Sequence, residues 1–97
     1  MNRYLLSPAA QADLEQIFDY TRELWDAGQA EAYLRELQRA IERVAANPRI
    51  GRACDEIRPG YFKLTTGSYT LFLRLAAGHI VDVVRILHQR MDIDRHL

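Results

Sequence analysis

The sequence has very little cysteine and lysine, and it contains no long apolar run. Its single cysteine, Cys54, excludes an internal disulfide and leaves a structural zinc site without companion thiols. No stretch approaches the roughly 20 apolar residues of a membrane span, and the first residues, MNRYLLSPAAQ, lack the apolar core of a secretory signal. These absences favour a cytoplasmic protein in a reducing compartment, with no membrane partner.

The length of 97 residues predicts one small domain over residues 1–97. Residues 1–48 hold five arginines against eight acidic residues, a net charge of −3, and residues 49–97 hold eight basic against five acidic residues, a net charge of +3. A basic C-terminal half suits an acidic partner, either protein or nucleic acid. The asymmetry is too small to predict DNA or RNA binding by itself.

Two amphipathic helices are expected in the first half of the chain. Residues 3–6 form a short candidate strand, and Ser7-Pro8 is a typical helix start, with Ser7 as N-cap. Apolar residues then recur at helical spacing, and Asp13 is expected largely off this apolar face. The face comprises Ala10, Leu14, Ile17, Phe18, Thr21, Leu24 and Trp25. Gly28 interrupts the pattern, and a second helical period runs from Ala30 to a stop near Asn47-Pro48, which predicts an antiparallel helical hairpin.

The second half reads as an irregular loop over residues 48–60 followed by three strands. The strands are expected at residues 61–65, 69–75 and 80–88, joined by turns at Gly67 and Gly78, so they form an antiparallel meander. Strict alternation in the last strand would place Val81, Val83, Arg85 and Leu87 on one face, and apolar residues on both faces favour a central strand. The predicted fold is α+β: an N-terminal strand and a helical hairpin packed on a small, mainly antiparallel, four-stranded sheet.

Few residue groups suggest chemistry. His88, Asp92 and His96 have metal-ligand spacing only if the segment is helical, and His88 ends a strand, so no metal site is expected. Acidic pairs such as Glu15 with Asp19 are better explained as a solvated helix face. Cys54 lies beside an acid that would raise its pKa, so a structural role is favoured over that of a nucleophile. No cofactor is expected.

A set of basic residues on the sheet leaves two interpretations open. Side chains of this kind can gather around a phosphate and stabilise the charge that develops in RNA cleavage. They can equally be exposed strand residues with no catalytic part. The set comprises Lys63, Arg74, Arg85 and His88.

Runs of residues along almost the whole chain resemble the ParE toxins of bacterial toxin–antitoxin pairs. The N-terminal part of the resemblance comprises Tyr4 to Ala10, Asp13-Leu14, Ile17, Tyr20, Trp25, Gln29-Ala30 and Tyr33. The C-terminal part comprises Asn47-Pro48, Gly51-Arg52, Asp55 to Arg58, Gly60-Tyr61, Gly67-Ser68 and the run VRILHQRMD from Val84 to Asp92. The closing run is the most specific of these.

The resemblance implies the fold of the RelE/ParE superfamily, a function as a non-enzymatic inhibitor of DNA gyrase, and neutralisation by a ParD-like antitoxin. No catalytic residue and no direct sequence-specific binding of nucleic acid are then expected. The alternative is the RelE branch, which cleaves messenger RNA on the ribosome with lysines, arginines and usually a C-terminal tyrosine. This chain has one lysine, Lys63, and no tyrosine after Tyr69, which favours the gyrase branch.

Two surfaces are candidates for partner binding. Large side chains on the helical hairpin either line an apolar groove for the antitoxin or close the core over the sheet; these are Tyr20, Leu24, Trp25, Tyr33 and Leu37. The polar segment after Leu87 either recognises gyrase from a rigid strand end or is a frayed terminus. The gyrase candidates are Arg58, Lys63, Arg74, Arg85, His88, Arg90, Met91, Asp92, Arg95 and His96.

Overall fold

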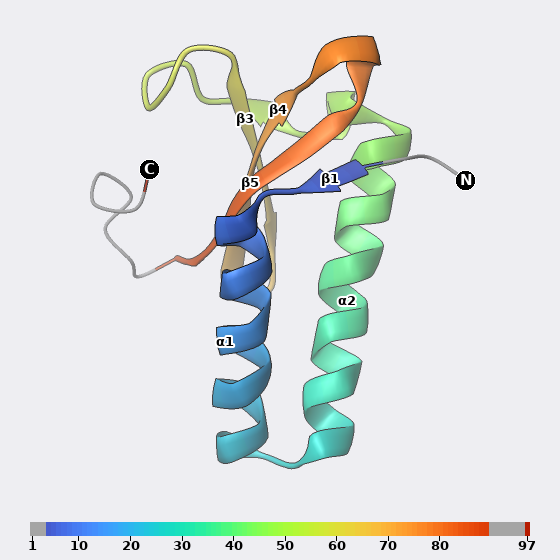
Figure 1. The fold of residues 1–97 in the computed structure, drawn as a ribbon, viewed down its shortest axis with the longest axis vertical. Coiled ribbons are helices and arrows are strands. Elements are labelled where there is room, and N and C mark those ends of the chain that lie inside the picture. The colour runs from blue at the N-terminus through green and yellow to red at the C-terminus, as the bar shows by residue number, and fades with distance from the viewer. Residues whose placement is uncertain (1–3, 90–96) are drawn as a thin grey trace.

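The computed structural model describes residues 4–89 and 97. Two helices pack on one face of a five-stranded sheet with the strand order β1-β5-β4-β3-β2 (Figure 1). The helices are α1 (Pro8–Leu24) and α2 (Ala27–Ala46), and the strands are β1 (Tyr4–Leu6), β2 (Arg52–Ala53), β3 (Tyr61–Thr66), β4 (Tyr69–Leu75) and β5 (Val81–His88). Among the described residues, no helix is both long and apolar enough to cross a membrane.

The helix boundaries follow from local capping. The hydroxyl of Ser7 accepts a hydrogen bond from Ala10 N, with Pro8 at the first helical position, as the sequence predicts. Asp26 caps α2 in the same way by accepting from Gln29 N. The prediction that Gly28 separates the helices is wrong, because Gly28 lies inside the first turn of α2 and the link is only Trp25-Asp26.

The predicted meander is confirmed, since β3, β4 and β5 pair antiparallel in sequence order. β1 pairs parallel with β5, so β5 is an inner strand, as its apolar residues indicated. The expected four-stranded sheet gains a fifth strand, β2, which pairs antiparallel with β3. The segment expected to be a loop, residues 48–60, therefore contains both β2 and the 3₁₀ turn η1 (Pro48–Ile50). A two-residue strand is too short to show an alternating pattern, so the sequence did not predict it.

A one-residue bulge divides β5. Phe72 lies opposite Arg85 and Leu73 opposite Val83, so Val84 has no partner on β4. A bulge moves the following residues to the other face of the strand. Ile86 therefore joins Val83 in the core beneath the helices, whereas Leu87 packs with Phe72 on the opposite face. The expectation that Val81, Val83, Arg85 and Leu87 share one face is thus wrong beyond Val83.

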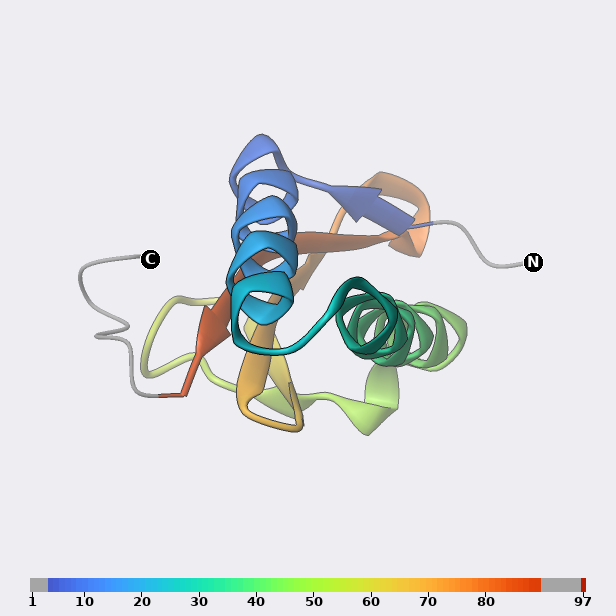
Figure 2. The same cartoon turned by 90° about the horizontal axis from the view of Figure 1, so that it is seen from below.

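The two faces of the sheet carry different apolar clusters. The larger cluster lies between the helices and the sheet, and Figure 2 shows this layer along the helix axes. It includes Ile17, Leu37, Ile41, Val44, Leu71, Leu73, Val81, Val83 and Ile86. On the outer face, away from the helices, a smaller cluster of Cys54, Phe72 and Leu87 is covered by Ile57, Tyr61 and Leu97. The outer face is therefore only partly open.

Candidate functional site

The exposed edge of β5 is closed by the start of α1. β1 accompanies β5 only as far as Val83, and beyond that point Ser7 takes over. Ser7 N donates to Val83 O at 3.0 Å, and the Ser7 hydroxyl donates to Val84 O at 2.6 Å. Unpaired backbone groups at a strand edge need such partners when they are shielded from water. Helix α1 thus replaces a strand along the second half of β5.

Asp13 continues this edge. Its carboxylate accepts hydrogen bonds from Ile86 N at 2.9 Å and from Arg85 Nε and Nη2 at 2.8 Å each. Asp13 is only 7 % exposed, so the expectation that it lies off the buried face is wrong. The hydrogen bond to Asp13 raises the pKa of Arg85, although burial opposes the shift. The pair is a charge-assisted, two-pronged contact that attaches β5 to α1.

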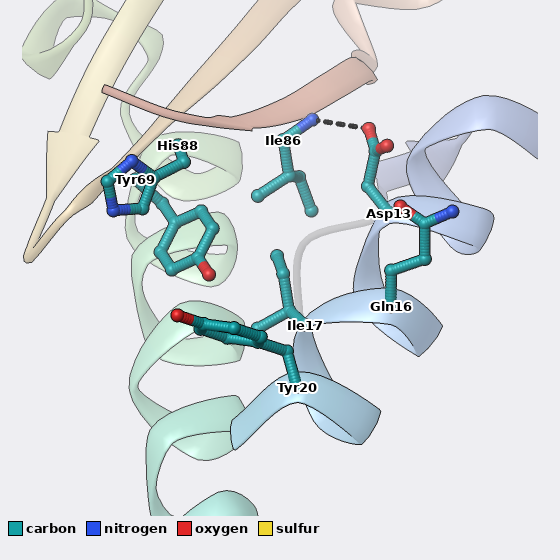
Figure 3. A pocket seen from close by; sticks show the side chains of 7 residues that line it. All are labelled: Asp13, Gln16, Ile17, Tyr20, Tyr69, Ile86 and His88. Atoms are coloured by element: carbon teal, nitrogen blue, oxygen red, sulfur yellow. Dashed lines mark hydrogen bonds between the residues drawn. The ribbon is translucent and has the colours of Figure 1, made fainter. Parts of the chain in front are cut away.

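Next to this pair lies a cavity of about 560 Å³. It is lined by Asp13, Gln16, Ile17, Tyr20, Tyr69, Ile86 and His88. Ile17 and Ile86 point toward one another across it, and the rings of Tyr20 and Tyr69 lie on the side away from Asp13 (Figure 3). Such a mixture of apolar floor and few polar groups is typical of a surface that receives side chains of a partner.

A row of aromatic rings connects this cavity to the tip of the helical hairpin. The Tyr69 ring meets His88 edge-on at a centroid distance of 5.3 Å, Tyr33 meets Tyr69 at 5.8 Å, and Trp25 lies 6.5 Å from Tyr33. Burial, followed by the neighbouring Tyr33 and Tyr20, raises the pKa of Tyr69. Edge-to-face pairs of this kind are favourable beyond the area they bury.

The structure separates the antitoxin candidates into two groups. Tyr20, Leu24 and Trp25 are 58 %, 56 % and 54 % exposed, so these three do not close the core. Tyr33 is half-buried and packs against the core cluster. Leu37 is 1 % exposed within that cluster, so it offers no surface to a partner. Its helical spacing could not distinguish a core position from a groove position.

The basic candidates do not surround one point. Arg74 Nε donates to Asp82 Oδ2 at 3.0 Å on β5, and that hydrogen bond raises the pKa of Arg74. Arg85 is bound to Asp13 instead, on α1. The hypothesis of a single phosphate cluster of Lys63, Arg74, Arg85 and His88 is therefore wrong, because two of the four cations are held by different carboxylates.

Arg58 and His88 occupy separate positions in the structure. Arg58 is exposed in the loop before β3, where its Nη1 donates to Ile57 O at 2.9 Å. His88 ends β5 and lines the large cavity. The other candidates, Arg90, Met91, Asp92, Arg95 and His96, lie outside the described residues.

Neither Cys54 nor the acidic residues of α1 lie in the cavity described above, except Asp13. Cys54 is fully buried, and burial raises the pKa of its thiol, with Glu56 adding to the shift and Lys63 opposing it. Glu15 and Asp19 are exposed on α1, as a solvated helix face requires. Among the residues that the structure describes, no group of three His, Cys, Asp or Glu side chains is placed to hold a metal ion.

Sequence reasoning missed Asp13 as a site residue and assigned Arg85 to a phosphate or to gyrase rather than to a pair within the chain. Asp13 falls three residues after Ala10 and four before Ile17, which is the spacing of the buried stripe. A buried acid needs a partner in most folds, so that signal was available. Arg52, on β2, lies opposite Lys63 on β3, and nothing in the sequence indicated strand β2.

Comparison with solved structures identifies the fold. A chain of the chromosomal ParDE toxin–antitoxin system from Pseudomonas aeruginosa superimposes with a TM-score of 0.77 at 20 % identity, over 91 % of this chain and 96 % of that one. A chain of the RelBE2 toxin–antitoxin complex from Mycobacterium tuberculosis gives a TM-score of 0.61, also at 20 % identity, over 91 % of this chain and 99 % of that one. The helical hairpin on a mixed sheet is thus a fold shared with chains of these two toxin–antitoxin systems.

Sequence comparison then gives the family. Residues 4–93 match the family model described as the ParE toxin of the type II toxin–antitoxin system parDE. Toxin ParE1 of Mycobacterium tuberculosis is 69 % identical over 96 residues, which cover 99 % of this chain and 98 % of that protein. Toxin ParE1 of Caulobacter vibrioides is 40 % identical over 97 residues, which cover 100 % of this chain and 99 % of that protein. The chain belongs to the ParE toxin family.

Proposed function

We propose that this ParE-family toxin inhibits DNA gyrase without catalysing a reaction and is held inactive by a ParD-like antitoxin. The observation that carries the proposal is the near full-length identity of 69 % to a protein named Toxin ParE1, in a family defined by the parDE pair. The proposed target implies action in the bacterial cytoplasm. No cofactor is needed for inhibition by binding.

The engagement of the two strand arginines supports a non-catalytic function. Arg74 is paired with Asp82 and Arg85 with Asp13, so both guanidinium groups already neutralise carboxylates of this chain. A ribonuclease needs such cations aimed at the charge that develops on the cleaved phosphate. The RelE-like alternative would require both guanidinium groups to leave their carboxylates first, and for the largely buried Asp13–Arg85 pair this costs about 3 kcal/mol.

The exposed end of the helical hairpin supports an antitoxin surface. Tyr20 lines the 560 Å³ cavity, and Leu24 lies four residues later on the same side of α1, so the apolar surface extends from the cavity toward Trp25. Large aromatic side chains near a pocket are the usual anchors of protein interfaces. We therefore place the ParD-like partner along Tyr20, Leu24, Trp25 and the adjoining part of Tyr33.

We propose the gyrase surface around the C-terminal end of β5, where His88 also borders the cavity. His88 ends a strand that Asp13 holds to α1, and Gln89 N donates to Ser68 O at 2.9 Å, so the segment that follows starts from a fixed point. We assign gyrase contacts to Arg58, Lys63, His88 and the segment containing Arg90, Met91, Asp92, Arg95 and His96. Arg74 and Arg85 act in this proposal by holding the strands rather than by touching gyrase.

A supercoiling assay tests the proposed function. Purified toxin is added to DNA gyrase and relaxed plasmid, with and without the protein of the neighbouring small reading frame. We expect the toxin alone to stop supercoiling and the neighbouring protein to restore it. Untouched supercoiling at high toxin concentration, together with cleavage of ribosome-bound message, would establish the RelE-like alternative instead.

A further inference from the structure

Two like charges face each other at one edge of the sheet. Arg52 on β2 and Lys63 on β3 are direct cross-strand partners. Residues opposite one another in an antiparallel pair project from the same face with Cβ atoms about 5 Å apart, where like charges are destabilising. In residues 4–89, neither side chain forms an ion pair with a carboxylate. The pair therefore concentrates positive charge without a carboxylate in direct contact among these residues.

Other cations on the same sheet are compensated. Arg74 lies within 3.0 Å of Asp82, and Arg85 lies within 2.8 Å of Asp13. The same fold thus places carboxylates beside two of its strand cations but not beside Arg52 and Lys63. The difference marks the uncompensated pair as a place where an external anion is stabilised.

Protection of the sheet edge accounts for only one of the two charges. β2 is an edge strand, and a charged residue there discourages pairing with another chain. Lys63 lies on β3, whose outer edge is already covered by β2 at this position. Its charge therefore has no part in guarding an edge.

A small hollow adjoins Lys63 on the outer face. Its volume is about 80 Å³, and it is lined by Lys63, Thr70, Phe72, Leu87, His88 and Gln89. Phe72 and Leu87 are buried and form an apolar floor, and none of the described residues that line the hollow is acidic. A cation beside apolar surface attracts an anion more strongly than a fully hydrated one does. The Thr70 hydroxyl and the Gln89 amide add neutral donors.

We propose that this hollow binds a phosphate group, with Lys63, Thr70 and Gln89 as its donors and Arg52 adding charge from the neighbouring strand. Lysine is a compact point charge that suits a phosphate, whereas a carboxylate is held best by the planar fork of an arginine. The phosphate comes either from a nucleic-acid backbone or from a free phosphate compound. Backbone binding of this kind is independent of sequence. The inference goes beyond gyrase inhibition and does not depend on it.

Salt-dependent DNA binding by the full-length chain tests the site. Each lysine that contacts a backbone phosphate adds about 0.9 to the slope of log affinity against log salt. We expect Lys63→Gln to reduce that slope by about 1. The affinity ratio of wild type to Lys63→Gln should therefore be about three- to fourfold larger at about 50 mM salt than at about 200 mM. Arg52→Gln should act in the same direction. Anisotropy of a labelled duplex measures both quantities.

Arg43→Gln is the matched control. Arg43 is an exposed arginine on α2, in the helical layer, and its substitution removes the same charge as Lys63→Gln. It should leave the salt slope unchanged. A second measurement titrates inorganic phosphate and follows the amide resonances of Lys63, Thr70 and Gln89, which should shift in wild type and not in Lys63→Gln. Phosphate shifts without DNA binding would identify free phosphate as the source. Equal effects of Arg43→Gln and Lys63→Gln on DNA binding, or no Lys63-dependent response to either probe, would overturn the site.

Discussion

The carboxylate of Asp13 and the guanidinium of Arg85, 72 residues apart in the chain, are joined by two hydrogen bonds of 2.8 Å. The same carboxylate accepts the backbone N–H of Ile86 at 2.9 Å. Both oxygens of Asp13 are therefore satisfied. Beyond the bulge, one edge of β5 pairs with β4, and the other edge is attached to α1 rather than to a further strand. His88 and Gln89 follow directly from this attachment.

Removal of the Asp13 carboxylate should destabilise the fold strongly. Asp13→Ala leaves the partly buried Arg85 and the Ile86 N–H without their acceptor, and loss of one partner from such a pair costs about 3 kcal/mol. The free energy of unfolding from urea denaturation measures the effect. Glu15→Gln, an exposed change on the same helix, should remain within about 0.5 kcal/mol of wild type. Equal losses from the two variants would contradict the importance of the pair.

Stability should fall in alkaline solution because of Cys54. Burial raises the pKa of this thiol in the folded protein above its ordinary value of 9.0, so the folded state retains a proton that the unfolded chain releases. The unfolded chain then binds fewer protons, and the free energy of unfolding decreases as the pH rises above about 8.5, until the folded thiol also titrates.

Urea denaturation between about pH 7 and pH 10 measures this loss, with Cys54→Ala as the comparison. The variant is less stable at every pH because it leaves a cavity, but its stability should decline less steeply across the alkaline range. Parallel curves for the two proteins would show that the buried thiol contributes nothing to the pH dependence.

Trp25 should contribute to antitoxin binding without supporting the fold. Its side chain is more than half exposed at the end of α1, so Trp25→Ala removes little buried area. Truncation of an aromatic anchor in an interface costs about 2 kcal/mol, or roughly thirtyfold in affinity. Calorimetric titration with the cognate antitoxin measures the affinity, and thermal unfolding checks the fold.

Leu75→Ala provides the control for that experiment. Leu75 is another exposed large apolar residue, but it lies at the end of β4, opposite Val81 at the start of β5, and lines neither the cavity nor the row of aromatic rings. The substitution should leave antitoxin affinity unchanged. Unchanged affinity in Trp25→Ala, or an equal loss in Leu75→Ala, would remove the hairpin end from the proposed interface.

The segment after Gln89 should be required for gyrase inhibition but not for antitoxin binding. Truncation after Gln89 keeps β5, the Tyr69–His88 ring contact and the hydrogen bond from Gln89 N to Ser68 O. DNA gyrase should then supercoil plasmid normally in the presence of the truncated protein, and the antitoxin should still bind that protein. Normal inhibition by the truncated protein would exclude this segment from the mechanism.

A triple substitution separates recognition from packing in that segment. Truncation also removes Leu97, which packs against the cluster of Cys54, Phe72 and Leu87, and this lowers stability. Replacing Arg90, Arg95 and His96 together by alanine keeps Leu97 and removes three polar side chains. This variant should also lose inhibition, and urea denaturation checks that it remains folded.

Local rules were sufficient to predict most of the elements from the sequence. The Ser7 cap, the helical spacing of apolar residues and the glycine turn at Gly67 each depend on residues a few positions apart. Such interactions are decided by backbone geometry within one or two turns, so a single sequence reveals them. The three strands of the meander were predicted for the same reason.

The candidate site was decided by contacts between distant segments. The Val84 bulge is defined by the pairing of β5 with β4, and the Asp13–Arg85 pair joins α1 to β5 across 72 residues of sequence. The same holds for Arg52 facing Lys63, since β2 is recognisable as a strand only through its pairing with β3. The sequence by itself determined the helices, the meander and the ParE resemblance. Only the tertiary structure decided which charged side chains are held by partners within the chain, because pairing of charges depends on distance in space and not on spacing along the chain.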